Sequence, residues 1–374
     1  MKKPKIFICW TTNSGTSFYR LFNYIKYLND DFDFGYSKWK PDFQGLPEWE
    51  FMINDPKHGA LISKDIHFLL SECQMVIAQK FNSQGGMAVM DMCQDLFPKK
   101  NFYMEIDDHI FAVNPSAPAY QTYHPGSEQE EIAKEQLSRS TGLIVSTEYL
   151  KKVYSQFNAN IFVVPNAIDF AVWDKLKAPK PHKKVRIGWA GGGTHVDDLE
   201  FIIPAIKKVL EKNKNLEFVF LGGVPDSLQG QPGINAIAKW YAIDKYPQEL
   251  ANLGIDIAIA PLRDNHFNRG KSNLRWLEYS ALKIPTVASN VEPYKCIENG
   301  NTGKLVTEVD EWVEALLELA SNKELRTKIG QSAYEKVKSD YNCKKIAKKY
   351  GEYMRLMLQN KGLFNPDSLI SVMT

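Results

Sequence analysis

Short apolar runs alternate along the chain with segments whose apolar residues recur every three or four positions. Runs of this length are typical of buried parallel strands, and the recurrent spacing is typical of amphipathic helices. One such helix carries Leu199, Ile202, Ile206 and Val209. The predicted strands are 6–10, 75–79, 102–107, 142–147, 161–165, 185–189, 216–222, 256–260 and 304–306. The alternation predicts an α/β fold built from doubly wound parallel sheets.

The length of 374 residues exceeds what one hydrophobic core usually serves, so we expect two domains. The stretch 175–184, KLKAPKPHKK, is rich in proline and lysine and is typical of a linker. We therefore place an N-terminal domain at 1–177 and a C-terminal domain at 178–340, followed by a helical segment at 341–374.

Charge and cysteine content narrow the function classes. The formal net charge is +2, so no overall basic field favours nucleic acid or a membrane surface as a partner. The five cysteines show neither close pairing nor zinc-type spacing, and we expect reduced thiols in a cytoplasmic protein. We expect neither a secretory leader nor a membrane-spanning segment. The lysines of 342–359 are expected to be solvated, and contact with a membrane surface is the less favoured alternative.

The stretch 256–303 carries the strongest candidate chemistry. A polar loop follows its strand, and Arg269 and Lys271 flank a helix for which Ser272 is the predicted N-cap. A helix start between two cations is an anion site, because backbone N–H groups and the helix dipole add to the two charges. Arg269 and Lys271 are therefore candidate catalytic residues for a reaction that develops negative charge.

Glu278 lies on or beside the apolar stripe of the same helix. Its carboxylate lies about 9 Å along the helix axis from the helix start, at roughly 1.5 Å per residue. This separation is comparable to that between the diphosphate and the ribose diol of a nucleotide, so one helix could hold both ends of a nucleoside diphosphate. An ordinary amphipathic helix with a solvated basic start is an equally open interpretation of this helix alone.

Four groups of residues resemble glycosyltransferase family 4 and its relatives of the GT-B fold. They are Pro261-Leu262, the run Lys271-Ser272…Glu278-Tyr279…Ala281…Pro285…Ala288-Ser289, Asn299-Gly300…Thr302-Gly303, and Val164-Pro165-Asn166-Ala167-Ile168-Asp169. The resemblance implies two Rossmann-like domains facing each other across a cleft, with the last helix returning to the first domain. It also implies a nucleotide-sugar donor, no cofactor, no bound metal and retention of anomeric configuration.

Family 4 usually has two glutamates eight positions apart. Glu278 matches the second, which binds ribose hydroxyls, and the first falls on Gly270. The resemblance further implies that a glycine-rich loop, in which Thr194 and Asp197 have capping-box spacing, faces the donor phosphates. The resulting donor-binding candidates are Gly192, Gly193, Thr194, Gly222, Ser272, Asn273 and Glu278. For His195, exposure to solvent is the simplest expectation, and Trp240 either stacks on a nucleobase or belongs to the core.

In the first half, candidate residues follow two strands. By resemblance, Gly15 and Thr16 face the reaction centre on the acceptor side, and Arg20 either reaches the cleft or is solvated. Asp107, Asp108 and His109 follow strand 102–107, where ligands usually sit. We interpret Asp107 as an acceptor-side residue and Asp108 and His109 as candidate catalytic residues, without assigning a base. The alternatives are a metal site, or a turn cap beside a surface histidine.

The function predicted is transfer of a sugar from a nucleotide donor to a hydroxyl of a glycan, lipid-linked or other acceptor. Three alternatives remain open. They are a glycosyltransferase that acts on modified nucleic acid, a sugar-nucleotide epimerase on the same fold, and a non-catalytic nucleotide-sugar-binding protein.

Overall fold

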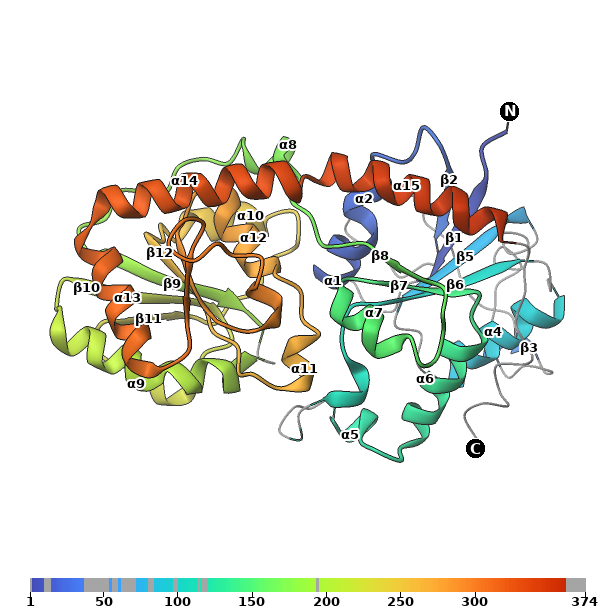
Figure 1. Cartoon of the computed structure of the whole chain (residues 1–374), viewed down its shortest axis with the longest axis horizontal. Helices are drawn as coiled ribbons and strands as arrows, with labels where there is room; N and C mark the ends of the chain where they lie inside the picture. Colours follow the sequence, from blue (N-terminus) through green and yellow to red (C-terminus); the bar gives the residue numbers. More distant parts are fainter. Residues whose placement is uncertain are drawn as a thin grey trace. The chain divides into compact units, whose positions relative to one another are not determined.

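The computed structural model describes residues 2–9, 15–36, 54–55, 60–61, 72–79, 84–96, 100–113, 115, 120–192 and 195–360. The chain divides into two compact units, and each has its own parallel sheet (Figure 1). The first unit is Met1–Pro165 with Lys344–Thr374, and the second unit is Asn166–Cys343. The predicted α/β class with two doubly wound parallel sheets is confirmed.

The first unit holds a six-stranded parallel sheet in the order β2-β1-β5-β6-β7-β8. Its strands are β1 (Lys5–Cys9), β2 (Asp33–Tyr36), β5 (Met75–Gln79), β6 (Asn101–Ile106), β7 (Gly142–Val145) and β8 (Ile161–Val163). Its main helices are α4 (Gln84–Leu96), α6 (Glu128–Arg139), α7 (Glu148–Tyr154) and α15 (Cys343–Gln359). Shorter elements are α1 (Gly15–Ser17), the π-helix η1 (Phe18–Phe22), α2 (Asn23–Ile25), η2 (Ile110–Ala112), α5 (Tyr120–Tyr123), and the hairpin strands β3 (Asn54–Asp55) and β4 (Ala60–Leu61).

The second unit holds a six-stranded parallel sheet in the order β11-β10-β9-β12-β13-β14. Its strands are β9 (Val185–Gly191), β10 (Leu216–Gly222), β11 (Ile234–Ile237), β12 (Ile257–Ala260), β13 (Thr286–Ser289) and β14 (Lys304–Val306). Its helices are α8 (Phe170–Trp173), α9 (Val196–Lys212), α10 (Tyr246–Asn252), α11 (His266–Arg269), α12 (Leu274–Ala281), α13 (Val309–Ser321) and α14 (Lys323–Asp340), with 3-10 turns η4 (Asp226–Leu228) and η5 (Glu292–Tyr294). This strand order is that of the Rossmann fold, whose topological switch point falls between β9 and β12.

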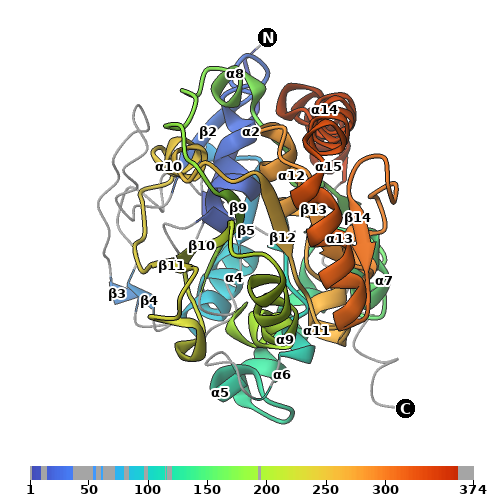
Figure 2. The same ribbon diagram turned by 90° about the vertical axis from the view of Figure 1, so that its left-hand side faces the viewer.

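Continuous burial explains why these strands could be predicted. Every residue of the predicted strands β5 and β12 is buried, as expected for parallel strands covered by helices on both faces. β13 is equally buried but was not predicted. In the second unit α9 and α13 lie side by side against the sheet (Figure 2). They bury Leu199, Ile206 and Trp312 in the same cluster as the strands. The apolar stripe of α9 therefore holds this helix against the sheet, and the first turn of α9 lies at the switch point.

The first boundary between the units lies between residues 165 and 166. The prediction placed it twelve positions later, between residues 177 and 178. The intervening segment is attached within the second unit, because Ile168 donates its N–H to Tyr341 O at 2.9 Å. The carboxylate of Asp174 also accepts hydrogen bonds from Tyr334 and Lys338, both at 2.8 Å. The second boundary lies at 343/344, against a predicted 340/341.

Two edge strands escaped prediction. In β11 the central residues Asn235 and Ala236 are exposed, so the strand shows no apolar run and was not predicted. β2 begins with the exposed Asp33 and is also an edge strand. Among the helices of the described residues, none is sufficiently long and apolar to span a bilayer.

Gly330 of α14 packs against the turn that ends α12, at Lys283, which has a φ of 58°. A Cβ at Gly330 would lie 2.0 Å from the carbonyl oxygen of Lys283. Gly330→Ala should therefore destabilise the protein by about 1–3 kcal/mol through overpacking, although alanine in an open helix stabilises by up to ~1 kcal/mol. Urea unfolding measures the change, with Gln331→Ala on the exposed face as the control. A midpoint equal to or above that of the wild type would contradict this packing.

Candidate functional site

The carboxyl edge of the second sheet gathers the loops that follow β9, β10 and β12. Gly191 ends β9, and Gly222 ends β10. The two strand ends are joined by a hydrogen bond of 3.0 Å from Gly223 N to Gly191 O. Gly222 has a φ of +100°, and a Cβ there would lie 2.2 Å from Gly191 O. Glycine is required at this position because both the backbone angle and the close approach exclude a side chain.

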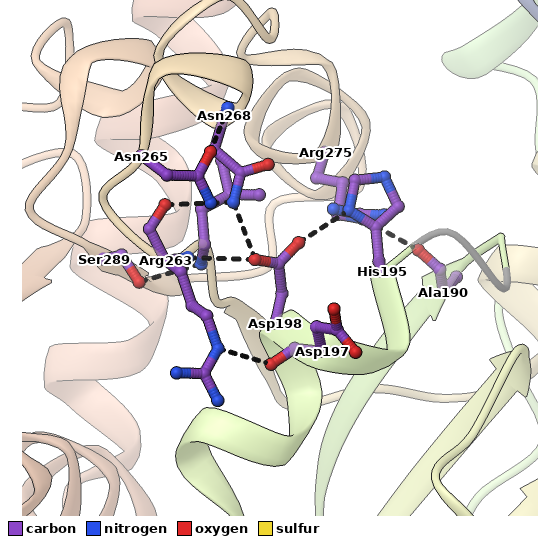
Figure 3. A network of polar contacts seen from close by, with 10 residues as sticks. Ala190, His195, Asp197, Asp198, Arg263, Asn265, Asn268, Arg275 and Ser289 are labelled. Carbon is purple, nitrogen blue, oxygen red and sulfur yellow. Dashed lines mark hydrogen bonds and ion pairs between the residues drawn. The ribbon is translucent and has the colours of Figure 1, made fainter. Parts of the chain in front are cut away.

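A buried carboxylate, Asp198, connects the first turn of α9 to the loop after β12 (Figure 3). Its Oδ1 accepts hydrogen bonds from the backbone N–H of Arg263 at 2.9 Å and from Nδ2 of Asn268 at 2.8 Å. Its Oδ2 lies 3.0 Å from Nδ1 of His195. Charge-assisted bonds of this kind are strong in a desolvated site. Asp198 therefore fixes the loops on both sides of the switch point.

The sequence suggested that His195 is exposed to solvent, and this expectation is wrong. It occupies the N-cap position of α9, and its side chain is 15% exposed. Burial, Arg275 and Lys271 lower the pKa of the imidazole to about 4, although Asp198 opposes the shift. The ring is therefore neutral at pH 7. The predicted capping box begins at Thr194, which, like Gly193, lies outside the described residues.

Arg275 is a site residue that the sequence did not predict. Its Nε donates to the carbonyl oxygen of Ala190 at 3.1 Å, and its guanidinium lies 5.0 Å from the ring centroid of Trp189. A Cβ at Gly191 would lie 2.4 Å from Arg275 Nη2. The sequence signal was a second cation in the first turn of the predicted helix, close in the chain to Lys271.

Lys271, Ser272 and Asn273 form the segment that leads into α12. Nζ of Lys271 lies 4.2 Å from the ring centroid of Phe267, and its charge contributes to the lowered pKa of His195. The predicted N-cap was wrong by one residue. Asn273 is the N-cap, and Ser272 Oγ accepts a hydrogen bond of 2.8 Å from Asn166 Nδ2. Nδ2 of Asn273 lies 3.2 Å from Cys296 Sγ, which holds this segment against the loop after η5.

Arg269 lies on the neighbouring short helix α11. Its guanidinium binds the carboxylate of Asp264 through two hydrogen bonds of 2.7 and 3.0 Å. Both side chains are substantially exposed. Gly270, which replaces the first family glutamate, follows as the C-cap of α11. Arg269 thus has a local anionic partner, whereas Lys271 and Arg275 act together on His195.

Glu278 is buried within α12 at 4% exposure. Its Oε2 accepts a hydrogen bond of 3.1 Å from the hydroxyl of Tyr246 in α10. Burial and the Glu278 charge raise the pKa of this tyrosine well above its usual value, so the phenol remains a donor. The neighbouring Tyr279 hydroxyl accepts from Ala190 N at 2.9 Å. The residues of α12 therefore reach the end of β9 through both Tyr279 and Arg275.

Trp240 lies beside Gly222 at the end of β10. Its nearest ring atom is 3.6 Å from the position that a Cβ on this glycine would take. Trp240 is 69% exposed, so a core role is excluded. The lysine at 239 lies over the neighbouring Tyr241 ring, with Nζ 4.7 Å from its centroid.

The first unit contains the remaining candidate residues. Tyr154 of α7 donates to Asp108 O at 2.5 Å, and its hydroxyl accepts from Ile110 N at 3.1 Å. Asp107, Asp108 and His109 are all partly exposed at the end of β6. Gly15 and Thr16 form the first residues of α1 and are also partly exposed.

Arg20 is neither solvated nor exposed to a cleft, contrary to both sequence interpretations. Its side chain is fully buried and bonds through Nε to Glu105 Oε1 at 2.6 Å. Gln79 donates to the other carboxylate oxygen at 2.7 Å and accepts from Ser17 Oγ at 2.6 Å. This network fixes the end of α1, at Ser17, against the carboxyl ends of β5 and β6. In the part of the chain that the structure describes, no group of three or more His, Cys, Asp or Glu residues could hold a metal ion.

Comparison with known proteins gives a family match within the second unit. The profile of the family described as Glycosyl transferases group 1 matches residues 184–322, a range that includes Lys271 and Arg275. A protein of Thermosipho melanesiensis described as a probable sucrose-phosphate synthase is 26% identical over 219 residues, covering 54% of this chain and 49% of that protein. The chain thus spans about half the length of this curated relative.

Two solved structures resemble the whole arrangement of elements. Anabaena HepE, in complex with UDP and glucose, has a TM-score of 0.67 at 13% identity, covering 94% of this chain and 100% of that chain. TarM of S. aureus, in complex with fondaparinux, α-GlcNAc-glycerol and UDP, has a TM-score of 0.54 at 17% identity, covering 76% of this chain and 55% of that chain. At such identities the likeness shows the fold alone. With the family match, it supports a glycosyltransferase of the group 1 type with the GT-B fold.

Proposed function

We propose that the protein transfers a sugar from a nucleoside-diphosphate sugar to an acceptor hydroxyl. The observation that carries the proposal is the pairing, on one helical segment, of two cations with a buried carboxylate. Lys271 and Arg275 lie at the start of this segment and jointly affect His195, and Glu278 lies further along it. The segment follows β12 at the switch point, where doubly wound sheets bind their ligands.

Each part of this segment has a role in donor binding. Lys271 and Arg275 neutralise the diphosphate, and Gly191 and Gly192 leave room for its approach. The carboxylate of Glu278 accepts hydrogen bonds from the ribose hydroxyls, while Tyr246 holds one of its oxygens. An ionised acceptor forms stronger hydrogen bonds to hydroxyl donors than a neutral one does.

The proposed chemistry is cleavage of the anomeric C–O bond through an oxocarbenium-like state, with retention of configuration. The departing diphosphate gains negative charge, which Lys271 and Arg275 stabilise electrostatically. Loss of one such preorganised contact costs about 2.7–4 kcal/mol of transition-state stabilisation. We propose that these cations replace a divalent metal and that no cofactor takes part. The acceptor, a glycan or lipid-linked hydroxyl, is assigned to the first unit's Asp107, Asp108 and His109, with Gly15 and Thr16.

The first test of this function is a thermal-shift screen with UDP-, GDP-, ADP-, CDP- and dTDP-sugars. We expect selective stabilisation by donors of one base, since a ligand that binds only the folded state raises its stability. The shift should survive EDTA. UDP-sugars come first because both similar structures contain UDP. Donor turnover without an acceptor would favour an epimerase, binding without transfer would favour a binding protein, and no shift with any donor would refute the proposal.

Glu278→Gln should weaken binding of the identified nucleotide by about tenfold, or ~1.4 kcal/mol. The charged acceptor is lost, whereas the side chain keeps its size and its contact with Tyr246. Calorimetry measures the affinity, with the exposed Glu314→Gln on α13 as a matched control. Equal affinities of the two variants would remove Glu278 from the donor site.

Lys271→Ala should lower turnover by about 100-fold or more, and donor affinity by less, because its contact strengthens as charge develops. Steady-state kinetics with saturating acceptor separate kcat from KM. Lys328→Ala, an exposed position on α14, provides the control. A loss confined to KM would mean that Lys271 only positions the donor.

A further inference from the structure

His195 is held in one orientation and one tautomer. Two donors, Arg263 N and Asn268 Nδ2, occupy Oδ1 of Asp198 and fix this buried carboxylate. The other oxygen faces Nδ1 of His195 at 3.0 Å, and a carboxylate can only accept a hydrogen bond. Nδ1 must therefore carry the proton, which leaves Nε2 as the atom of the ring that titrates.

The charges around the ring come from three places. Asp198 on α9 is the anion, Arg275 on α12 is one cation, and Lys271 just before α12 is the other. Arg275 is held in place by Ala190 O and the Trp189 ring, and Figure 3 shows it in the same network as His195. With no anion bound, burial and the two cations keep the ring neutral, because the pKa lies at about 4.

A diphosphate bound by Lys271 and Arg275 reverses the effect of the surrounding charges on the His195 ring. Its negative charge offsets both cations and adds an opposite charge beside the ring. An opposite charge within 4–6 Å typically shifts a pKa by about 1–3 units towards the charged form. The imidazolium then has Asp198 on one nitrogen and a phosphate oxygen within reach of the other.

We propose that His195 takes up a proton from solvent when a nucleoside diphosphate occupies this site, and that the imidazolium formed binds a diphosphate oxygen through Nε2. This inference rests on the proposed donor site and adds to it a third cation that exists only in the loaded state. The balance is one solvent proton gained per diphosphate bound, with no covalent change. A third positive charge also stabilises the diphosphate as it departs from the sugar.

The direction of the pH effect follows from linkage. Since the ring binds its proton more tightly in the complex, affinity rises as pH falls through the pKa of the complex towards that of the free protein. The titration of phosphate, with a second pKa of about 6, opposes this trend for UDP. A comparison of two variants with the same ligand cancels the phosphate contribution.

The test is calorimetry of UDP binding at about pH 6, in buffers of different ionisation enthalpy, which yields the protons taken up. His195→Asn is the informative variant, because its amide can still donate to Asp198 but does not titrate. We expect the wild type to take up about half a proton or more in excess of His195→Asn. The exposed His124→Asn in the first unit should match the wild type.

The experiment distinguishes failure of this inference from failure of the proposed function. UDP binding with equal proton uptake in wild type and His195→Asn would overturn this inference and leave the proposed function intact. No binding of UDP, GDP, ADP, CDP or dTDP by the wild type would overturn both. The wild type alone gives an independent measurement, since ¹⁵N shifts of the histidine ring report its charge. A neutral His195 at about pH 6 with UDP bound would also overturn the inference.

Discussion

The switch point of the second sheet depends on the desolvated carboxylate of Asp198. Asp198 accepts hydrogen bonds from two donors in the loop after β12 and faces His195 at the start of α9. An unsatisfied buried charge is costly, so all three partners must be in place together. The geometry of Lys271, Arg275 and Glu278 relative to β9 is consequently determined before any ligand arrives.

The sequence predicts features that are local in the chain and misses those that depend on distant contacts. Strands such as β5 and β12 are buried on both faces, so each appears as an apolar run. Lys271 and Glu278 could be related because one short segment, the start of α12 and the residues before it, contains both. Arg275 gained significance only through Ala190, which is 85 positions away, and Asp198 through Asn268, which is 70 positions away. No local pattern distinguishes these polar residues from a solvated helix face.

The departure at Gly270 fits the same organisation. The resemblance to family 4 implies a glutamate there, whereas this chain ends α11 with glycine and supplies its nearby charges from Lys271 and Arg275. His195, Arg275 and Trp189 form a compact group in which each side chain limits the freedom of the next.

The discontinuity of the first unit has a consequence for biosynthesis. Asn101 of β6 donates to Met357 O at 2.8 Å, and Tyr24 packs edge-on against Tyr350, so the last helix completes a core begun by the first strand. The second unit is contiguous, and its closing contact joins Ile168 to Cys343. During translation, domains usually fold in the order in which they emerge from the ribosome. Here the first unit emerges early but cannot be completed until the second has been made, so its amino-terminal part must wait for α15 while residues 166–343 are synthesised.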